Sequence, residues 1–169
     1  MAYILTRDLA GIDHIAFKRK FDEYFSYLKS VKEKLPQEVF DFAMASWHYD
    51  FSDHRCPHDS WVEYLNIIEL SSGERRRNRE IEIKVRLLGA YHDGYLDLIY
   101  KGVQTYALAK KDGTWHGDWH RDEIRLSEEG LVLHEVDFIG GDHWIIVCRN
   151  IEYKWIPFEN KKMKELIEC

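Results

Sequence analysis

The chain has 169 residues, the size of one domain with its own hydrophobic core. Its apolar fraction of 45% and charged fraction of 32% are those of an ordinary globular protein and exclude a disordered or fibrous chain. No stretch approaches the roughly 20 apolar residues of a membrane span, and the net charge of -6 opposes general binding to nucleic acid.

The N-terminus and the cysteines indicate the compartment. The opening MAYILTRDLAG has a base and an acid too early for a secretory signal. Cys56, Cys148 and Cys169 are odd in number and share no CxxC spacing, so they predict neither a disulfide framework nor a thiolate zinc site. We therefore expect a cytoplasmic protein with reduced thiols and no membrane association.

The first third of the chain, about residues 12–46, is predicted to be helical. Apolar residues recur there at intervals of three and four, the spacing of one helix face: Ile12, Ile15, Phe21, Tyr24, Phe25, Leu28 and Val31. Leu35-Pro36 interrupts the pattern, and Pro36 is well placed to begin a second short helix. The following WHYDFSDHRCPHDS is polar and aromatic with a proline, which is typical of a loop.

Residues from about 59 to 155 are predicted to form an antiparallel sheet. The clearest strand is EIEIKVRL, residues 80–87, where apolar and charged residues alternate. Turn signals divide the rest, and six strands are expected at roughly residues 59–70, 80–91, 95–108, 114–126, 131–139 and 143–155. The arginine-rich run at residues 75–79 could contact phosphates or an acidic partner, but a solvated hairpin turn is the simpler interpretation.

These elements predict a single α+β domain over residues 1–169. Short turns favour a twisted antiparallel meander, curled into a half-barrel or a sandwich, with one or two N-terminal helices packed on it. Residues 156–169 are expected to be a C-terminal tail or a short helix. An open sheet leaves edge strands that are covered or paired, so a homo-oligomer is an open alternative.

The stretch WHGDWHRDE, residues 115–123, holds two histidines, three carboxylates and two tryptophans. Strict alternation along a strand turns His116, Asp118, His120 and Asp122 toward the core. The same alternation turns Trp115, Trp119, Arg121 and Glu123 away from the core. His134 is also expected to point inward, because it shares a phase with Val132, Val136 and Phe138.

One chemical hypothesis is a metal-binding hydrolase or a small-molecule site at one end of the sheet. If the histidines converge with a carboxylate, they supply the three or four ligands of a zinc or iron site: His58, His116, His120, His134 and Asp122. Four strand residues span about 13 Å, so His116 and His120 share an ion only if Gly117 bends the strand. HExxH and glycine-rich phosphate loops are absent from the sequence.

Two nucleophiles offer chemistry without a metal. Ser60 follows His58-Asp59, although no GxSxG elbow is present. Cys56 lies among His54, Arg55 and His58, which could lower its thiol pKa. The simpler interpretation is that Ser60 and Asp59 bond local backbone groups and that Cys56 is an ordinary thiol.

The alternative function is recognition of another protein. Aromatic residues on acidic strands resemble interface composition, because aromatic anchors supply most of the binding energy. The candidate partner-binding residues are Trp115, Trp119, Arg121 and Glu123, and further exposed aromatics could be Trp47, Tyr91 and Tyr95.

A resemblance points in the same direction. The runs HDSWVEYLNIIEL, REIEIKVRLLGAYHDGYLDLIYKGVQTYAL, WHRDEIRLSEEGLVLHEVDF and IIVCRNIEYKW resemble small bacterial domains of unknown function, some of which are similar to immunity proteins of polymorphic toxin systems. The resemblance covers roughly residues 58–155 and carries no catalytic signature. It implies a non-enzymatic, cytoplasmic protein-binding domain without a cofactor, and it transfers no active residue.

Overall fold

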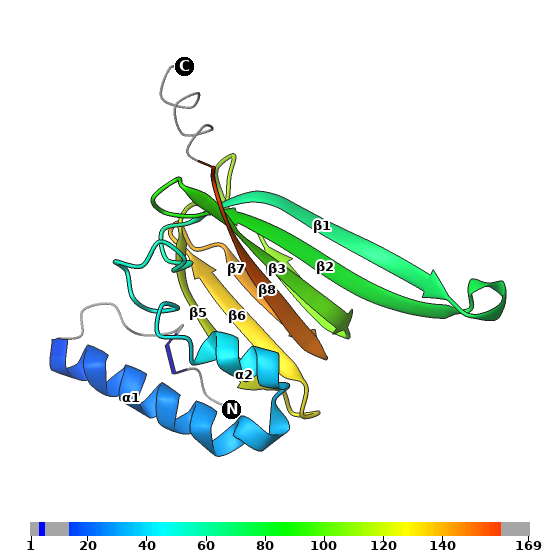
Figure 1. The fold of residues 1–169 in the computed structure, drawn as a ribbon, viewed down its shortest axis with the longest axis horizontal. Helices are drawn as coiled ribbons and strands as arrows, with labels where there is room; N and C mark the ends of the chain where they lie inside the picture. Colours follow the sequence, from blue (N-terminus) through cyan, green and yellow to red (C-terminus); the bar gives the residue numbers. More distant parts are fainter. Residues whose placement is uncertain (1–3, 6–13, 160–169) are drawn as a thin grey trace.

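The computed structural model describes residues 4–5 and 14–159, which form an α+β fold (Figure 1). This confirms the predicted fold class. The helices within these ranges are α1 (His14–Val31), the 3-10 turn η1 (Lys32–Lys34) and α2 (Gln37–Ala43). The strands are β1 (Trp61–Ser72), β2 (Asn78–Leu88), β3 (Gly94–Val103), β4 (Thr105–Ala109), β5 (Trp119–Leu126), β6 (Val132–Phe138), β7 (His143–Cys148) and β8 (Asn150–Pro157), with a second 3-10 turn, η2 (Glu74–Arg76), between β1 and β2.

The strands form two four-stranded antiparallel sheets, ordered β1-β2-β3-β8 and β4-β7-β6-β5. Two segments predicted as single strands bend and contribute to both sheets, so six expected strands become eight within the described residues. The bends lie at Gln104 and Arg149, where the backbone N–H groups of Gln104 and Arg149 bond the carbonyls of Val147 (2.8 Å) and Lys101 (3.0 Å). Gly102 has a φ of +59°, and the Arg149 side chain occupies the space of its missing Cβ. Hydrophobic alternation continues through such a bend, so the pattern alone did not reveal it.

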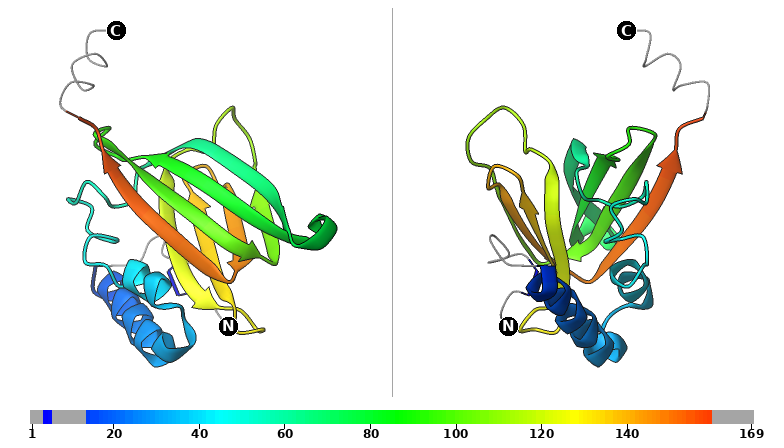
Figure 2. Two further views of the ribbon diagram at one scale, coloured as in Figure 1. Left: turned by 45° about the vertical axis from the view of Figure 1, so that its right-hand side comes forward. Right: turned by 90° about the vertical axis from the view of Figure 1, so that its left-hand side faces the viewer.

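Two separate groups of strands follow the predicted meander, in which neighbours in sequence pair with each other. Consecutive strands pair from β1 to β3 and from β5 to β7, but β4 pairs with β7 instead of β5. At the opposite edges, the start of β1 meets the start of β5: Asp59 N–H donates to Trp119 O at 2.8 Å, and Trp119 N–H donates to Ser60 O at 2.9 Å. The two sheets therefore face each other like a partly closed barrel (Figure 2).

The core fills the space between the inner faces of the two sheets. Its largest members are aromatic and aliphatic side chains that are essentially fully buried: Trp119, Trp144, Tyr100, Ile83, Leu87, Leu96, Leu98 and Ile124. Helix α2 packs beside β8, with the Phe42 ring 4.9 Å from the Tyr153 ring. No helix in the described part of the chain is both long and apolar enough for a transmembrane segment.

Helix α1 covers the free edge of β5. Tyr24, Leu28 and Val31 are buried as its periodicity predicted, whereas Ile15 is 80% exposed and Ile12 lies outside the described residues. The Tyr24 hydroxyl accepts a hydrogen bond from Ile124 N–H at 2.7 Å and donates to Ile124 O at 3.2 Å. The Tyr27 hydroxyl accepts from Leu126 N–H at 2.9 Å. Two tyrosines thus bond backbone groups that a neighbouring strand would otherwise satisfy.

We expect Tyr24→Phe to lower the free energy of unfolding by about 1–2 kcal/mol, because it leaves the buried backbone of Ile124 without its partner while keeping the packed ring. Urea unfolding followed by circular dichroism measures this loss. Tyr106→Phe, at an exposed position of β4, is the matched control and should change stability by less than about 0.5 kcal/mol. Equal effects of the two substitutions would contradict the edge-covering role of Tyr24.

Candidate functional site

A β-bulge at the start of β5 changes which side chains face the core. The pairing of β5 with β6 shifts between Trp119 and Arg121. Because the bulge adds a residue, Trp119 and Asp122 both point inward, with exposed fractions of 1% and 2%. The inward placement of Asp122 is as predicted, but the outward placement of Trp119 is wrong.

The other three predicted partner-binding residues differ in how far solvent reaches their side chains. Trp115 is 54% exposed, Arg121 is half-buried, and Glu123 is fully buried. Glu123 does lie on the face away from the core, but its Oε2 accepts hydrogen bonds from the backbone N–H groups of Leu5 (2.5 Å) and Ile4 (3.0 Å). Alternation could not predict that burial, because the covering residues are about 120 positions away in the sequence.

Glu123 belongs to an ionic cluster on that outer face of the β4-β7-β6-β5 sheet. The guanidinium of Arg125 lies between Glu123 and Glu135, and the Nε2 of His143 is 3.0 Å from Glu135 Oε1. Burial raises the pKa of Glu135 to about 7, although the positive charges of Arg125 and His143 oppose the rise. This cluster fastens residues 4–5 to the sheet and offers no open site.

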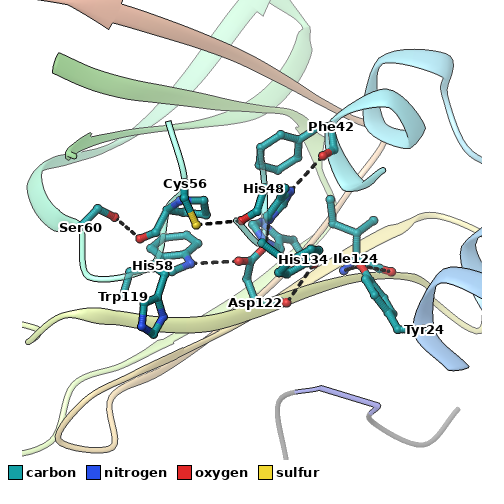
Figure 3. Close-up of polar contacts among 12 residues, drawn as sticks. Tyr24, Phe42, His48, Cys56, His58, Ser60, Trp119, Asp122, Ile124 and His134 are labelled. Atoms are coloured by element: carbon teal, nitrogen blue, oxygen red, sulfur yellow. Dashed lines mark hydrogen bonds and ion pairs between the residues drawn. The ribbon is translucent and has the colours of Figure 1, made fainter. Parts of the chain in front are cut away.

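Asp122 is the centre of a buried polar network on the inner side (Figure 3). Its Oδ2 accepts from His48 Nε2 at 2.8 Å and from His134 Nε2 at 3.0 Å, and its Oδ1 accepts from Trp119 Nε1 at 3.1 Å. His48 is 1% exposed and His134 is fully buried. The inward orientation predicted for His134 is therefore confirmed. The segments that meet here are β5, β6 and the turn after α2.

The partners of the two ring nitrogens of His48 assign its protons. His48 Nδ1 lies 2.9 Å from the carbonyl oxygen of Phe42, which only accepts, and His48 Nε2 faces the Asp122 carboxylate. Both nitrogens of His48 must donate, so this ring is an imidazolium. His134 Nε2 donates to Asp122, and its Nδ1 lies 2.9 Å from the Tyr100 hydroxyl, which can either donate or accept.

The charge of Asp122 agrees with an imidazolium at His48. Burial alone would raise the pKa of Asp122, but the positive charge of His48 and the hydrogen bonds from His134 and His48 hold it well below its ordinary value. A buried, ionised carboxylate that accepts three hydrogen bonds stabilises the fold through its partners, and at 2% exposure it is not accessible as a base for a substrate.

The space beside the network is too small for a substrate. A cavity of about 20 Å³ is lined by His48, Trp119, His120 and Asp122, among others. That is the volume one water molecule needs. The network therefore fits a structural role better than a catalytic one.

The predicted metal ligands lie in three separate places. His134 and Asp122 belong to the buried network. His58 and His120 have ring centroids 5.8 Å apart, with His58 Nδ1 2.7 Å from His120 O. Within residues 4–5 and 14–159, no group of three or more His, Cys, Asp or Glu residues is arranged to hold a metal ion.

The bend at Gly117 separates the fifth predicted ligand, His116, from the other four. Gly117 has a φ of +82°, and a Cβ there would lie 2.2 Å from Ile139 O, so only glycine fits. The bend directs His116 to Asp142, at 2.9 Å between Nδ1 and Oδ2, and to the ring of Trp144. The glycine does bend the chain, but it separates His116 from His120 instead of joining them.

The candidate nucleophiles, Ser60 and Cys56, both donate hydrogen bonds to backbone carbonyls of the loop before β1. The buried Ser60 hydroxyl donates to Pro57 O at 2.5 Å, and the buried Cys56 thiol donates to His48 O at 3.0 Å. Burial raises the pKa of the Cys56 thiol to about 12, so a thiolate is disfavoured. Both residues follow the simpler interpretation.

Exposed aromatic rings gather where the loops meet at the starts of β1, β3 and β5. We call Phe51, Trp61, Tyr91 and Trp115 the aromatic end; their exposed fractions are 52%, 39%, 49% and 54%. Of the other aromatics considered from the sequence, Trp47 is only 9% exposed and Tyr95 is half-buried.

The rings of the aromatic end are held in defined positions. Trp61 contacts Trp115 edge to face at 5.6 Å, and its Nε1 donates to Asp118 Oδ1 at 2.7 Å. The Tyr91 ring stacks on His54 at 4.1 Å, and its hydroxyl donates to Phe51 O at 3.1 Å. These contacts connect segments that are remote in the sequence, so the loops support one another.

An apolar groove begins at Phe51 and runs between α1 and residues 44–51. Its volume is about 740 Å³, and its lining includes Phe17, Phe21, Phe25, Met44, Tyr49 and Phe51, with Lys18, Asp22 and Asp50 also present. The groove is therefore continuous with the aromatic end.

Sequence reasoning missed His48, Tyr100 and two rings of the aromatic end. His48 and Tyr100 show no periodic signal that distinguishes them from ordinary loop and strand residues. The only signal for Phe51 and Trp61 was the density of aromatic residues in the loop before β1.

We expect Asp122→Asn to lower the free energy of unfolding at neutral pH by about 3 kcal/mol, because it leaves His48 buried without its counterion. The wild-type protein should also lose stability as the pH falls below about 4, since the unfolded chain then takes up a proton that the folded Asp122 resists. Urea unfolding across this pH range should show a shallower acid slope for the variant. An unchanged slope would contradict the assignment.

Nitrogen-15 NMR of the imidazole rings tests the proton assignment directly. At pH 7 we expect His48 to show two protonated nitrogens, because both of its nitrogens face acceptors. Tyr100→Phe removes the hydroxyl beside His134 Nδ1 and should shift only the signals of that ring. A neutral His48 in the folded protein would overturn the ion pair.

Comparisons with known proteins add no assignment to this geometry. No family model, no curated protein and no solved structure matches this chain. The function is therefore inferred from the site itself.

Proposed function

We propose that this chain is a non-enzymatic protein-binding domain of the cytoplasm that engages its partner through the aromatic end. The observation that carries the proposal is the set of four exposed rings, Phe51, Trp61, Tyr91 and Trp115, held in place by hydrogen bonds and ring contacts. Rigid aromatic side chains are the usual anchors of protein interfaces, and their fixed positions reduce the entropy lost on binding.

The charge around the rings indicates the chemistry of the partner. The loops that carry them hold Asp50, Asp53, Asp59, Asp93, Asp112 and Asp118, against Arg55, Lys110 and Lys111. An acidic rim favours a partner with a basic surface, because opposite charges steer the encounter. The groove beside Phe51 offers the partner an apolar recess for one of its own side chains.

An immunity-type role is the specific form we propose for this binding. Its support is the resemblance of residues 58–155 to small bacterial domains of unknown function, some of which are similar to immunity proteins, together with a set of exposed aromatic rings. The metal-binding alternative has less support, because its five ligands are divided among three places and the buried carboxylate already accepts three hydrogen bonds from protein side chains.

Trp115→Ala is expected to weaken partner binding by about 30-fold or more, the effect of a strong interface anchor. Tagged wild-type protein, Trp115→Ala and the matched control Tyr106→Ala are used as bait in lysate of the native cell, followed by mass spectrometry. A stoichiometric protein other than the bait should be retained by wild type and Tyr106→Ala and be lost from Trp115→Ala.

Circular dichroism of the three baits confirms equal folding, and metal analysis of the same samples tests the alternative. Recovery of no partner, or equal recovery by all three baits, would contradict the proposed surface. Stoichiometric zinc or iron that disappears in His120→Ala would favour the metal site instead.

A further inference from the structure

Strand β1 has an uncovered edge. It is the longest strand of the described residues, at 12 positions, and β2 pairs with it along one side only. On the other side, the backbone bonds of Asp59 and Ser60 to Trp119 lie just before the strand begins. From Glu63 to Ser72, no described residue pairs with that edge, and the β1–β2 hairpin extends beyond the rest of the fold (Figure 1).

This edge is only lightly protected compared with typical edge strands of monomers: its charged side chains are Glu63 and Glu69, of which Glu69 lies opposite Ile81 on the inner face. The free edge of β5 is covered by Tyr24 and Tyr27, but β1 contains no lysine or proline, and its one bulge lies near its start, at Glu63. Apolar residues at every third position are exposed instead. Trp61, Tyr64, Ile67 and Leu70 are each 39–41% exposed.

We propose that a second copy of this chain covers the edge, with its β1 antiparallel to the first and a two-fold axis at Ile67. Ile67 is the midpoint of the free segment, which runs from about residue 62 to residue 72. In this register Tyr64 of each copy lies opposite Leu70 of the other, and the two Ile67 residues meet at the axis. The β1-β2-β3-β8 sheets of the two copies then form one eight-stranded sheet.

The faces of the strand agree with this register. Tyr64 and Leu70 lie opposite Arg86 and Glu80 of β2, on the outer face, whereas Ile67 lies opposite Ile83, on the inner face. Paired residues in a sheet must share a face, and a two-fold axis perpendicular to the sheet preserves this. The exposed apolar residues Tyr64, Ile67 and Leu70 therefore each meet an apolar residue on their own face.

The charges select this register over its neighbour. With the axis at Ile67, Glu63 faces Ser71 and Glu69 faces Leu65, so no like charges meet. Moving the axis to Asn66 would place Glu63 opposite Glu69 and cost stability. Beyond the paired segment, Arg75 of one copy reaches the level of Asp59 of the other, which brings the exposed arginines of the hairpin tip toward the acidic loops.

The first test is the mass of the full chain in solution. Multi-angle light scattering should give twice the chain mass of 20.3 kDa, and Leu70→Lys should raise the dimer dissociation constant about tenfold or more, because two lysines then face Tyr64 across the interface. Ile139→Lys, at an exposed apolar position outside β1, is the matched control and should leave the dimer intact. A monomeric wild-type chain would overturn the proposal.

Cross-linking tests the register and does not depend on the stability of the lysine variant. In a Cys169→Ser background, Ile67→Cys should form a covalent dimer on mild oxidation, since the two residues meet at the axis. Ile139→Cys should remain monomeric on a non-reducing gel. A dimer that cross-links through Asn66→Cys but not through Ile67→Cys would disprove this register.

Two variants separate the dimer from the proposed binding function. Trp115→Ala is expected to remain dimeric, whereas Leu70→Lys is expected to retain a partner captured by the aromatic end. Loss of the dimer in Trp115→Ala would show that the exposed tryptophan belongs to the self-interface instead.

Discussion

The buried Asp122 carboxylate is the constraint on which the arrangement of the helices and both sheets depends. An ionised group in a core is tolerated only when its charge is paired and both of its oxygens accept hydrogen bonds. His48, His134 and Trp119 meet these requirements from the turn after α2, from β6 and from β5 itself. The Tyr100 hydroxyl extends the network to β3 in the other sheet. One side chain thus ties together segments separated by up to 74 positions.

The bulge that places Trp119 beside Asp122 also shapes the end of the molecule. Trp119 bonds the backbone of Asp59 and Ser60, which closes the sheets at the starts of β1 and β5. The loops before these strands are consequently held side by side, and Trp61 and Trp115 meet above them. The Trp119 indole thus belongs to the buried network, while its backbone bonds the segment that leads into β1. A rigid core and a preorganised surface are therefore two results of one local irregularity.

The same closure leaves the far end of β1 without a neighbour. The barrel is joined at Asp59 and Ser60, but from Glu63 onward β1 diverges from β5 and carries its hairpin outward. The molecule thus presents two different kinds of surface. The aromatic end consists of side chains on mutually supporting loops and suits a different protein, whereas the β1 edge offers backbone groups in a self-complementary pattern and suits a second copy.

Much of the fold followed from the sequence alone. Alternation from residue 80 to 87 and helical spacing from residue 21 to 31 are local consequences of burying one face, so they predicted β2 and α1 and the α+β class. The inward orientation of His134 could also be predicted, because its neighbours on β6 alternate without interruption. Glycine at position 117 permitted a bend that the sequence alone did not require, and the structure has one there, with a φ of +82°.

Only the tertiary structure decided where the polar groups meet. A bulge inverted the side of Trp119, residues 4–5 buried Glu123, and the bend at Gly117 carried His116 to Asp142 instead of to His120. None of these outcomes is encoded in a nearest-neighbour pattern, because each depends on a contact between distant segments. The sequence by itself determined which residues alternate and which helix face is apolar, whereas long-range hydrogen bonding decided which histidine pairs with which carboxylate.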